Sequence, residues 1–172
     1  MRELGTWSFV TGMLVAAHAV AGEQVYLPPE AFVMQALGGS AQQRLLWVTK
    51  PIEADLAAIM GHPPAQLRQR YWEANDKTAW IFEEIGKEQP ITAGFVVAGG
   101  RIEQARVLIY RESRGMEIRY PAFLRQYTGA ALTERGRLSK DIDGIVGATL
   151  SVNAMERMAR AALYLDRMSR TR

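Results

Sequence analysis

The sequence predicts an α+β fold, in which helices cover a twisted, mostly antiparallel sheet. Two observations lead to this prediction. Residues 67–110 contain four short segments rich in β-branched and aromatic residues, separated by turn-forming residues, which is typical of an antiparallel meander. Residues 152–168 form an amphipathic run without Gly or Pro, which indicates a closing helix that packs one face onto the sheet.

The segment before the meander is expected to form two short helices with a strand between them. Proline stands near the start of each helix, where its missing N–H costs no hydrogen bond. Glycine follows each helix and is a common residue at helix ends. Thr49 is placed to cap the second helix. The expected elements are a helix over 28–37, a strand over 42–48 and a helix over 51–60.

The meander is expected to continue into a mixed segment and then the closing helix. The clearest hairpin joins the third and fourth strands through Gly99-Gly100. A short helix is expected over 123–127, and 138–142 should lead into a glycine-containing loop. One stripe of the closing helix should face the core because its apolar residues recur at helical spacing. The expected strands are 67–72, 78–85, 91–98 and 102–110, and the stripe is Val152, Met155, Ala159, Ala162 and Leu165.

The composition of the chain argues against several functional classes. The chain has 172 residues, which fits one domain with a real core, and 48% of them are hydrophobic. The net charge of +3 is too small and too dispersed to indicate nucleic-acid binding. There is no cysteine, which excludes disulfides, thiol catalysis and thiolate metal sites. Only His62 remains beyond the first 21 residues, and with this single histidine the sequence predicts neither a Ser-His-Asp triad nor a metal site.

Residues 1–21 have the pattern of a secretory signal peptide. Arg2 gives a short basic start, residues 7–15 are mostly apolar, and small residues offer cleavage after Ala19 or Ala21. We therefore expect a periplasmic protein with a mature domain over 22–172. An uncleaved anchor, which would leave the protein membrane-associated, and an ordinary N-terminal helix are the alternatives.

The stretch over 143–149 carries the strongest functional signal. Two glycines and an alanine leave the backbone nearly bare just before the closing helix, with Thr149 at or near the helix start. A helix start has unpaired N–H groups and a partial positive charge, which suits a phosphate. The alternative is that Thr149 is simply a helix cap. The pattern is not a P-loop because no Lys precedes the Thr.

This stretch resembles the flavinylation motif of the FMN-binding domain family, which includes flavin-carrying subunits of ion-pumping NADH:quinone and ferredoxin:NAD reductases. The resemblance implies FMN as cofactor, held by a phosphoester on Thr149 and installed from FAD by a flavin transferase. Val146 departs from the pattern, which usually has Ser or Thr there. The matching residues are Asp143, Gly144, Gly147, Ala148, Thr149 and Ser151.

A second resemblance precedes the motif. The family places a hairpin before a Glu-Thr-Pro-Gly-Leu-Gly loop, and this chain has its clearest hairpin followed by Glu112-Ser113-Arg114-Gly115. The resemblance covers roughly residues 85–165 and adds Glu112, Ser113 and Arg114 to the implied cofactor-binding residues. A solvated loop with a local ion pair is the alternative for this segment.

The expected function is therefore periplasmic electron transfer through covalent FMN. No substrate pocket is evident in the sequence, which favours a carrier over an enzyme with its own substrate. The resemblance implies two kinds of partner: the flavin transferase, and a redox protein for which a membrane-bound protein or a cytochrome is a candidate. Non-covalent binding of FMN or another phosphate ligand, and a flavin-free adaptor, remain as alternatives.

Overall fold

The computed structural model of the protein describes residues 22–171, and the predicted signal peptide lies outside the described residues. Six antiparallel strands form one sheet in the order β1-β6-β5-β4-β3-β2, which confirms the predicted α+β class. The strands are β1 (Gln24–Val25), β2 (Gln42–Trp47), β3 (Arg68–Ala74), β4 (Lys77–Ile85), β5 (Pro90–Ala98) and β6 (Arg101–Tyr110). The helices are α1 (Pro29–Leu37), α2 (Lys50–Met60), α3 (Pro121–Leu124) and α4 (Thr149–Arg170), with 3₁₀ turns at Met116–Arg119 and Arg125–Tyr127.

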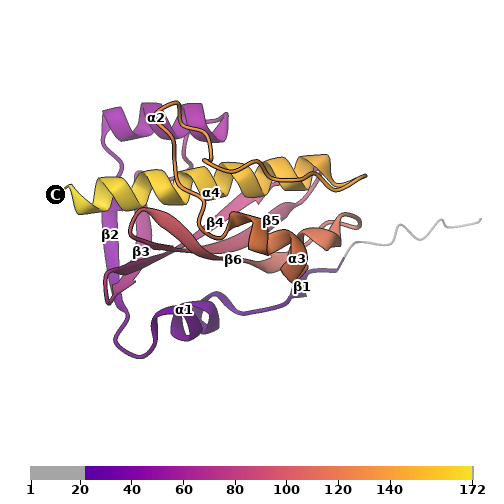
Figure 1. Cartoon of the computed structure of the whole chain (residues 1–172), viewed down its shortest axis with the longest axis horizontal. Helices are drawn as coiled ribbons and strands as arrows, with labels where there is room; N and C mark the ends of the chain where they lie inside the picture. Colours follow the sequence, from indigo (N-terminus) through magenta and orange to yellow (C-terminus); the bar gives the residue numbers. More distant parts are fainter. Residues whose placement is uncertain (1–21, 172) are drawn as a thin grey trace, which may run out of the picture.

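The sheet lies between two helical layers (Figure 1). Helix α4 crosses one face with α2 beside it, and α1 covers part of the opposite face. Strand β5 is central and has seven consecutive buried residues, because helices cover both of its faces. The α1 face shows how closely the layers approach. A Cβ added at Gly94 would lie 2.5 Å from the Phe32 ring, so this position in β5 requires glycine.

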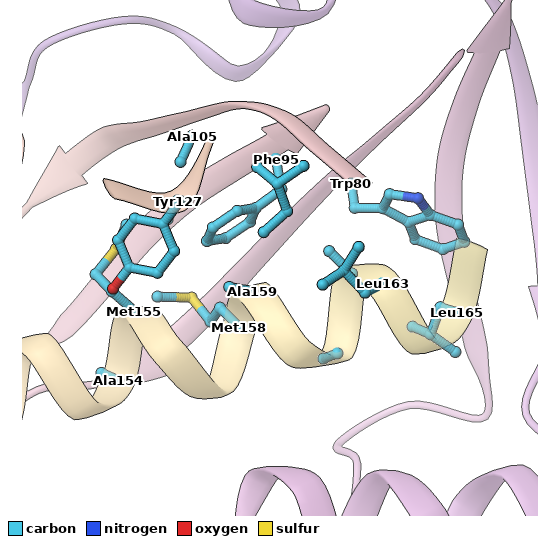
Figure 2. Packing of buried hydrophobic residues seen from close by; sticks show 14 of the residues in the cluster. Trp80, Phe95, Ala105, Tyr127, Ala154, Met155, Met158, Ala159, Leu163 and Leu165 are labelled. Atoms are coloured by element: carbon cyan, nitrogen blue, oxygen red, sulfur yellow. The ribbon is translucent and has the colours of Figure 1, made fainter. Parts of the chain in front are cut away.

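The main core lies between α4 and the sheet (Figure 2). The predicted stripe of the closing helix is buried in full, which confirms its assignment to the core. Trp80 and Phe95 are cross-strand partners that project from the sheet toward α4. Tyr71 stacks on Trp80 with ring centroids 4.6 Å apart, and Phe95 contacts Tyr127 edge-on at 6.4 Å. Tyr71, Trp80 and Phe95 are therefore core residues of the sheet.

Several predicted boundaries need correction. The closing helix begins at Thr149, where its start was predicted, and so extends three residues before the amphipathic run. The helix expected over 123–127 is instead α3 over Pro121–Leu124 followed by a 3₁₀ turn. Strand β1 was not predicted, because a two-residue strand has no periodicity to detect. Thr49 is at the cap position of α2, but its side chain makes no capping hydrogen bond.

Candidate functional site

The candidate site lies where the loop over 143–147 enters α4. Ala148 occupies the N-cap position and Thr149 is the first helical residue, with an exposed side chain. Gly144 and Gly147 are also exposed, and a Cβ added at either would meet no atom within 4 Å. Thr149 is therefore approachable from solvent over a backbone with little side-chain bulk.

The start of α4 has no group of its own to satisfy its first N–H donors. No side chain caps the helix, and its first turn contains no acidic residue. The first hydrogen bond of the helix runs from the Val152 N–H to the Ala148 carbonyl at 2.9 Å. The N–H groups before Val152 thus lack an intrahelical acceptor, and α4 is 22 residues long, so its positive end is fully developed. This end fits the phosphate of a nucleotide cofactor. Because Ala148 holds the cap position, the alternative in which Thr149 is a cap is wrong.

Ser151 is brought close to the site but faces inward. Ser151 is 4% exposed, and its Oγ atom lies near the Tyr110 hydroxyl at the end of β6: a Cβ added at Gly115 would lie 3.3 Å from the first and 3.0 Å from the second. Ser151 is therefore a packed residue of the first helical turn, and its hydroxyl is not open to a second protein.

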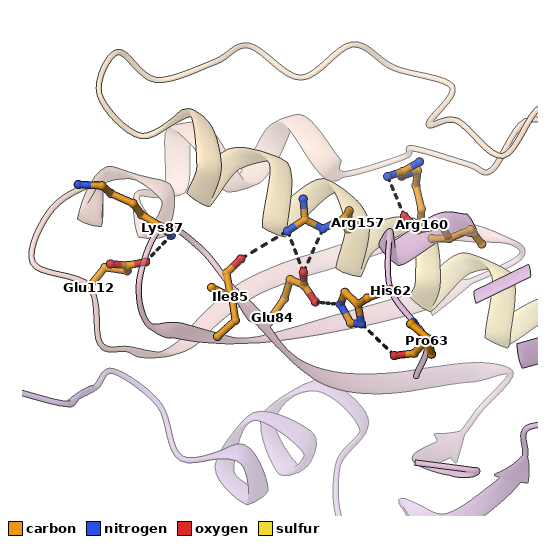
Figure 3. Close-up of polar contacts among 9 residues, drawn as sticks. His62, Pro63, Glu84, Ile85, Lys87, Glu112, Arg157 and Arg160 are labelled. Carbon is orange, nitrogen blue, oxygen red and sulfur yellow. Dashed lines mark hydrogen bonds and ion pairs between the residues drawn. The ribbon is translucent and has the colours of Figure 1, made fainter. Parts of the chain in front are cut away.

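Glu112 is placed to shape a loop. Its Oε1 atom accepts hydrogen bonds from three consecutive backbone N–H groups, those of Lys87, Glu88 and Gln89, at 2.5, 2.7 and 3.1 Å (Figure 3 shows the first). Three donors on one carboxylate oxygen form a strong charge-assisted anchor. Glu112 thus fixes the loop between β4 and β5 beside the start of α4.

The other predicted site residues are less constrained. Ser113 and Arg114 are exposed, and neither side chain hydrogen-bonds another residue within 22–171. The Arg114 carbonyl, however, accepts a hydrogen bond from the Tyr110 hydroxyl. Asp143 is exposed, and its backbone N–H donates to Gln126 Oε1 at 2.7 Å. These side chains are therefore free to meet a ligand, and the fold does not require them.

A charged cluster that the sequence did not indicate lies on β4 (Figure 3). The Glu84 side chain is only 5% exposed and bonds both His62 Nε2 and Arg157 Nη2 at 2.8 Å. His62 Nδ1 lies 2.9 Å from the Pro63 carbonyl oxygen. Since both ring nitrogens face oxygen acceptors, only the doubly protonated imidazolium satisfies both contacts. Hydrogen bonding to Pro63 and then to Glu84 accordingly raises the pKa of His62 above its ordinary value.

This arrangement predicts a pH-dependent contribution to stability. Because the folded-state pKa of His62 is raised, its contribution is fully present below the unfolded pKa of about 6.5 and is lost as pH rises through the folded pKa. We expect the unfolding midpoint of wild type to exceed that of His62→Gln most at pH 5.5, with the difference shrinking toward pH 8.5. Urea titrations across this range test it. A difference that stays constant or grows with pH would contradict the charged contact.

Two surface hollows lie at the other end of α4. They have volumes of about 680 and 230 Å³, and Arg170 lines both. Thr149 lines neither, so the candidate site is an open surface and not one of these hollows. Among residues 22–171, no helix has both the length and the apolar character needed to cross a membrane.

Comparison with known proteins finds one family model and a similar solved structure. Residues 86–164 match the family model described as the FMN-binding domain, a range that includes Tyr110, Glu112, Thr149 and Ser151. The crystal structure of Shewanella oneidensis NqrC is similar in fold, with a TM-score of 0.52 and 13% sequence identity over 74% of this chain and 80% of that one. No curated protein sequence matches the chain significantly.

Proposed function

Because residues 86–164 match the family model described as the FMN-binding domain, we propose that the protein is an electron carrier that holds FMN covalently on Thr149. The observation that supports the covalent bond is the exposed Thr149 at an uncapped helix start within the matched region. FMN supplies the redox chemistry when bound, and the protein supplies attachment and surroundings.

The attachment step needs FAD and a flavin transferase. The Thr149 hydroxyl oxygen forms a bond to the flavin-side phosphorus of FAD, the pyrophosphate P–O bond breaks, and AMP leaves while the hydroxyl proton passes to solvent. No electrons are exchanged in this step. The N–H groups at the start of α4 are suited to hold the phosphate, whose negative charge the helix dipole stabilises.

The proposed function includes export to the periplasm. A covalent tether is useful outside the cytoplasm, where a dissociated cofactor is lost by diffusion, and residues 1–21 have the signal-peptide pattern. The mature protein then works in the periplasm and exchanges electrons with a redox partner, a membrane-bound protein or a cytochrome. The open surface around Thr149 suits a carrier, because both the transferase and the redox partner must reach the cofactor.

A denaturing gel tests covalent attachment. Protein co-expressed with the transferase is expected to show flavin fluorescence after denaturation, since only a covalent flavin remains with the unfolded chain. Protein that is yellow when native and dark in the gel would support non-covalent FMN binding instead. Protein that is colourless in both states would support the flavin-free adaptor.

Substitution of Val146 should affect attachment only slightly. Val146 is fully exposed, so Val146→Ser removes no packing, and it restores the hydroxyl usual at this place in the motif. We expect the variant to be flavinylated at least as fast as wild type in a transferase assay. Labelling of the Ser variant together with an unlabelled wild type would identify Val146 as the mark of a domain that has lost its cofactor.

A further inference from the structure

The Thr149 side chain is not fixed by hydrogen bonds of its own hydroxyl. No hydrogen bond within residues 22–171 involves the Thr149 hydroxyl, and the side chain is exposed. Its position must therefore follow from the residues that fix the first turn of α4. Ser151 is the polar residue of that turn that is buried, at 4% exposure.

Ser151 is connected to the end of β6 by a chain of hydroxyl groups. The Tyr110 hydroxyl donates to the Arg114 carbonyl and lies near Ser151 Oγ, since a Cβ added at Gly115 would lie 3.0 Å from the first and 3.3 Å from the second. The one proton of the Tyr110 phenol is committed to the Arg114 carbonyl, so in a hydrogen bond between the two hydroxyls Ser151 would be the donor. Burial raises the pKa of Tyr110, which keeps the phenol protonated and able to donate. In this arrangement Ser151 donates to Tyr110, and Tyr110 donates to the Arg114 carbonyl.

The backbone packs closely around the Ser151 and Tyr110 hydroxyls. Gly115 has a φ of +83°, and a Cβ added there would lie 3.0 Å from both the Tyr110 hydroxyl and the Ala148 Cβ. The loop after β6 therefore packs directly on the residue that precedes Thr149. On the other side, a Cβ added at Gly86 would lie 2.9 Å from Glu112 Oε1 and 3.4 Å from Ser151 Oγ. Two loops and the first turn of α4 meet around Ser151.

We propose that Tyr110 is a positioning residue for the flavin acceptor, which it orients by fixing the first turn of α4 through Ser151. The Tyr110 side chain is buried with the rest of the core, so the role assigned to it is an indirect one. This inference rests on the proposed function, because it assigns Tyr110 a role in attachment to Thr149. Tyr110 thereby contributes to the rate of flavin transfer and not merely to the stability of the fold.

Tyr110→Phe is the direct test, because it keeps the buried ring and removes only the hydroxyl. Tyr164→Phe is the matched control. Tyr164 lies on α4 itself, 15 residues beyond Thr149 (164 − 149), and its hydroxyl donates to Asp55 Oδ2 at 2.6 Å. Each variant loses one phenolic hydroxyl that is anchored in the folded state, so their losses of stability should be comparable.

The measurement is flavin transfer from FAD by the transferase, with the protein as the varied substrate. We expect Tyr110→Phe to lower kcat by about tenfold with KM little changed, because the acceptor docks normally but is misoriented. Tyr164→Phe should leave both constants as in wild type. Ser151→Ala should match Tyr110→Phe, and the double variant should be no slower than either single variant, since both remove the same connection.

A second readout needs no flavin. Hydrogen exchange at the first bonded amides of α4, beginning with Val152, should be faster in Tyr110→Phe and unchanged in Tyr164→Phe. Wild-type kcat in Tyr110→Phe, or an equal fall in both variants, overturns the positioning role while leaving the proposed function intact. A wild type that accepts no flavin overturns the proposed function itself, and with it the role of Tyr110.

Discussion

Thr149→Val is expected to yield a folded protein without covalent flavin when it is co-expressed with the transferase. Valine matches threonine in shape and lacks only the hydroxyl that the phosphoester requires. Because the Thr149 side chain is exposed and caps nothing, the cost in unfolding free energy should stay within about 0.5 kcal/mol. Denaturing-gel fluorescence reports the flavin, and thermal unfolding reports the fold.

Thr149→Ser is the matched control, because it keeps a hydroxyl at the same backbone position. It should retain modification to the extent that the transferase tolerates loss of the methyl group. Fluorescence that persists in the Val variant would move the attachment to another hydroxyl. Ser151 is poorly suited to that role, because its side chain is buried near Tyr110. The exposed Ser113 would then be the first candidate for the attachment site.

The second large effect is expected at Glu84. Glu84→Ala removes the buried carboxylate that Arg157 and His62 share, and it leaves the partly buried guanidinium of Arg157 without its main partner. The predicted loss is about 3 kcal/mol of unfolding free energy, as for other broken buried ion pairs. Urea unfolding measures it, and the slope with denaturant should be unchanged if only stability is affected.

Glu103→Ala is the control for Glu84→Ala. Glu103 also forms an ion pair, in which its Oε1 atom lies 2.6 Å from Lys77 Nζ, but both side chains are well exposed. Exposed pairs of this kind contribute little, so the loss should be below about 1 kcal/mol. Equal losses at the two positions would contradict the view that burial makes the Glu84 cluster important.

The sheet was accessible to sequence reasoning because its signals are local. The hairpin of β5 and β6 is set by Gly99-Gly100 between two segments rich in β-branched residues, and the structure pairs these segments as expected. The stripe of α4 was likewise visible, since the helical period is a property of one segment. Both signals are confined to about 20 residues, and neither depends on distant parts of the chain.

The interactions that complete the site were not accessible in this way. Glu112 anchors amides 87–89 more than 20 residues earlier, and Tyr110 meets Ser151 across 41 positions (151 − 110). His62 read as an isolated histidine because its partner Glu84 lies on a strand 22 positions away. Such contacts depend on the tertiary arrangement, which no local pattern of one sequence encodes. The identity of the acceptor at Thr149 came from the motif and stays a prediction.

The most direct test of covalent attachment is mass spectrometry of the protein co-expressed with the transferase. The intact mass is predicted to exceed that of the unmodified chain by one FMN less one water. Fragmentation of the peptide that contains the start of α4 should place this increment on Thr149. An unmodified intact mass in a protein that is yellow in solution, or an increment on any other residue, would contradict the account.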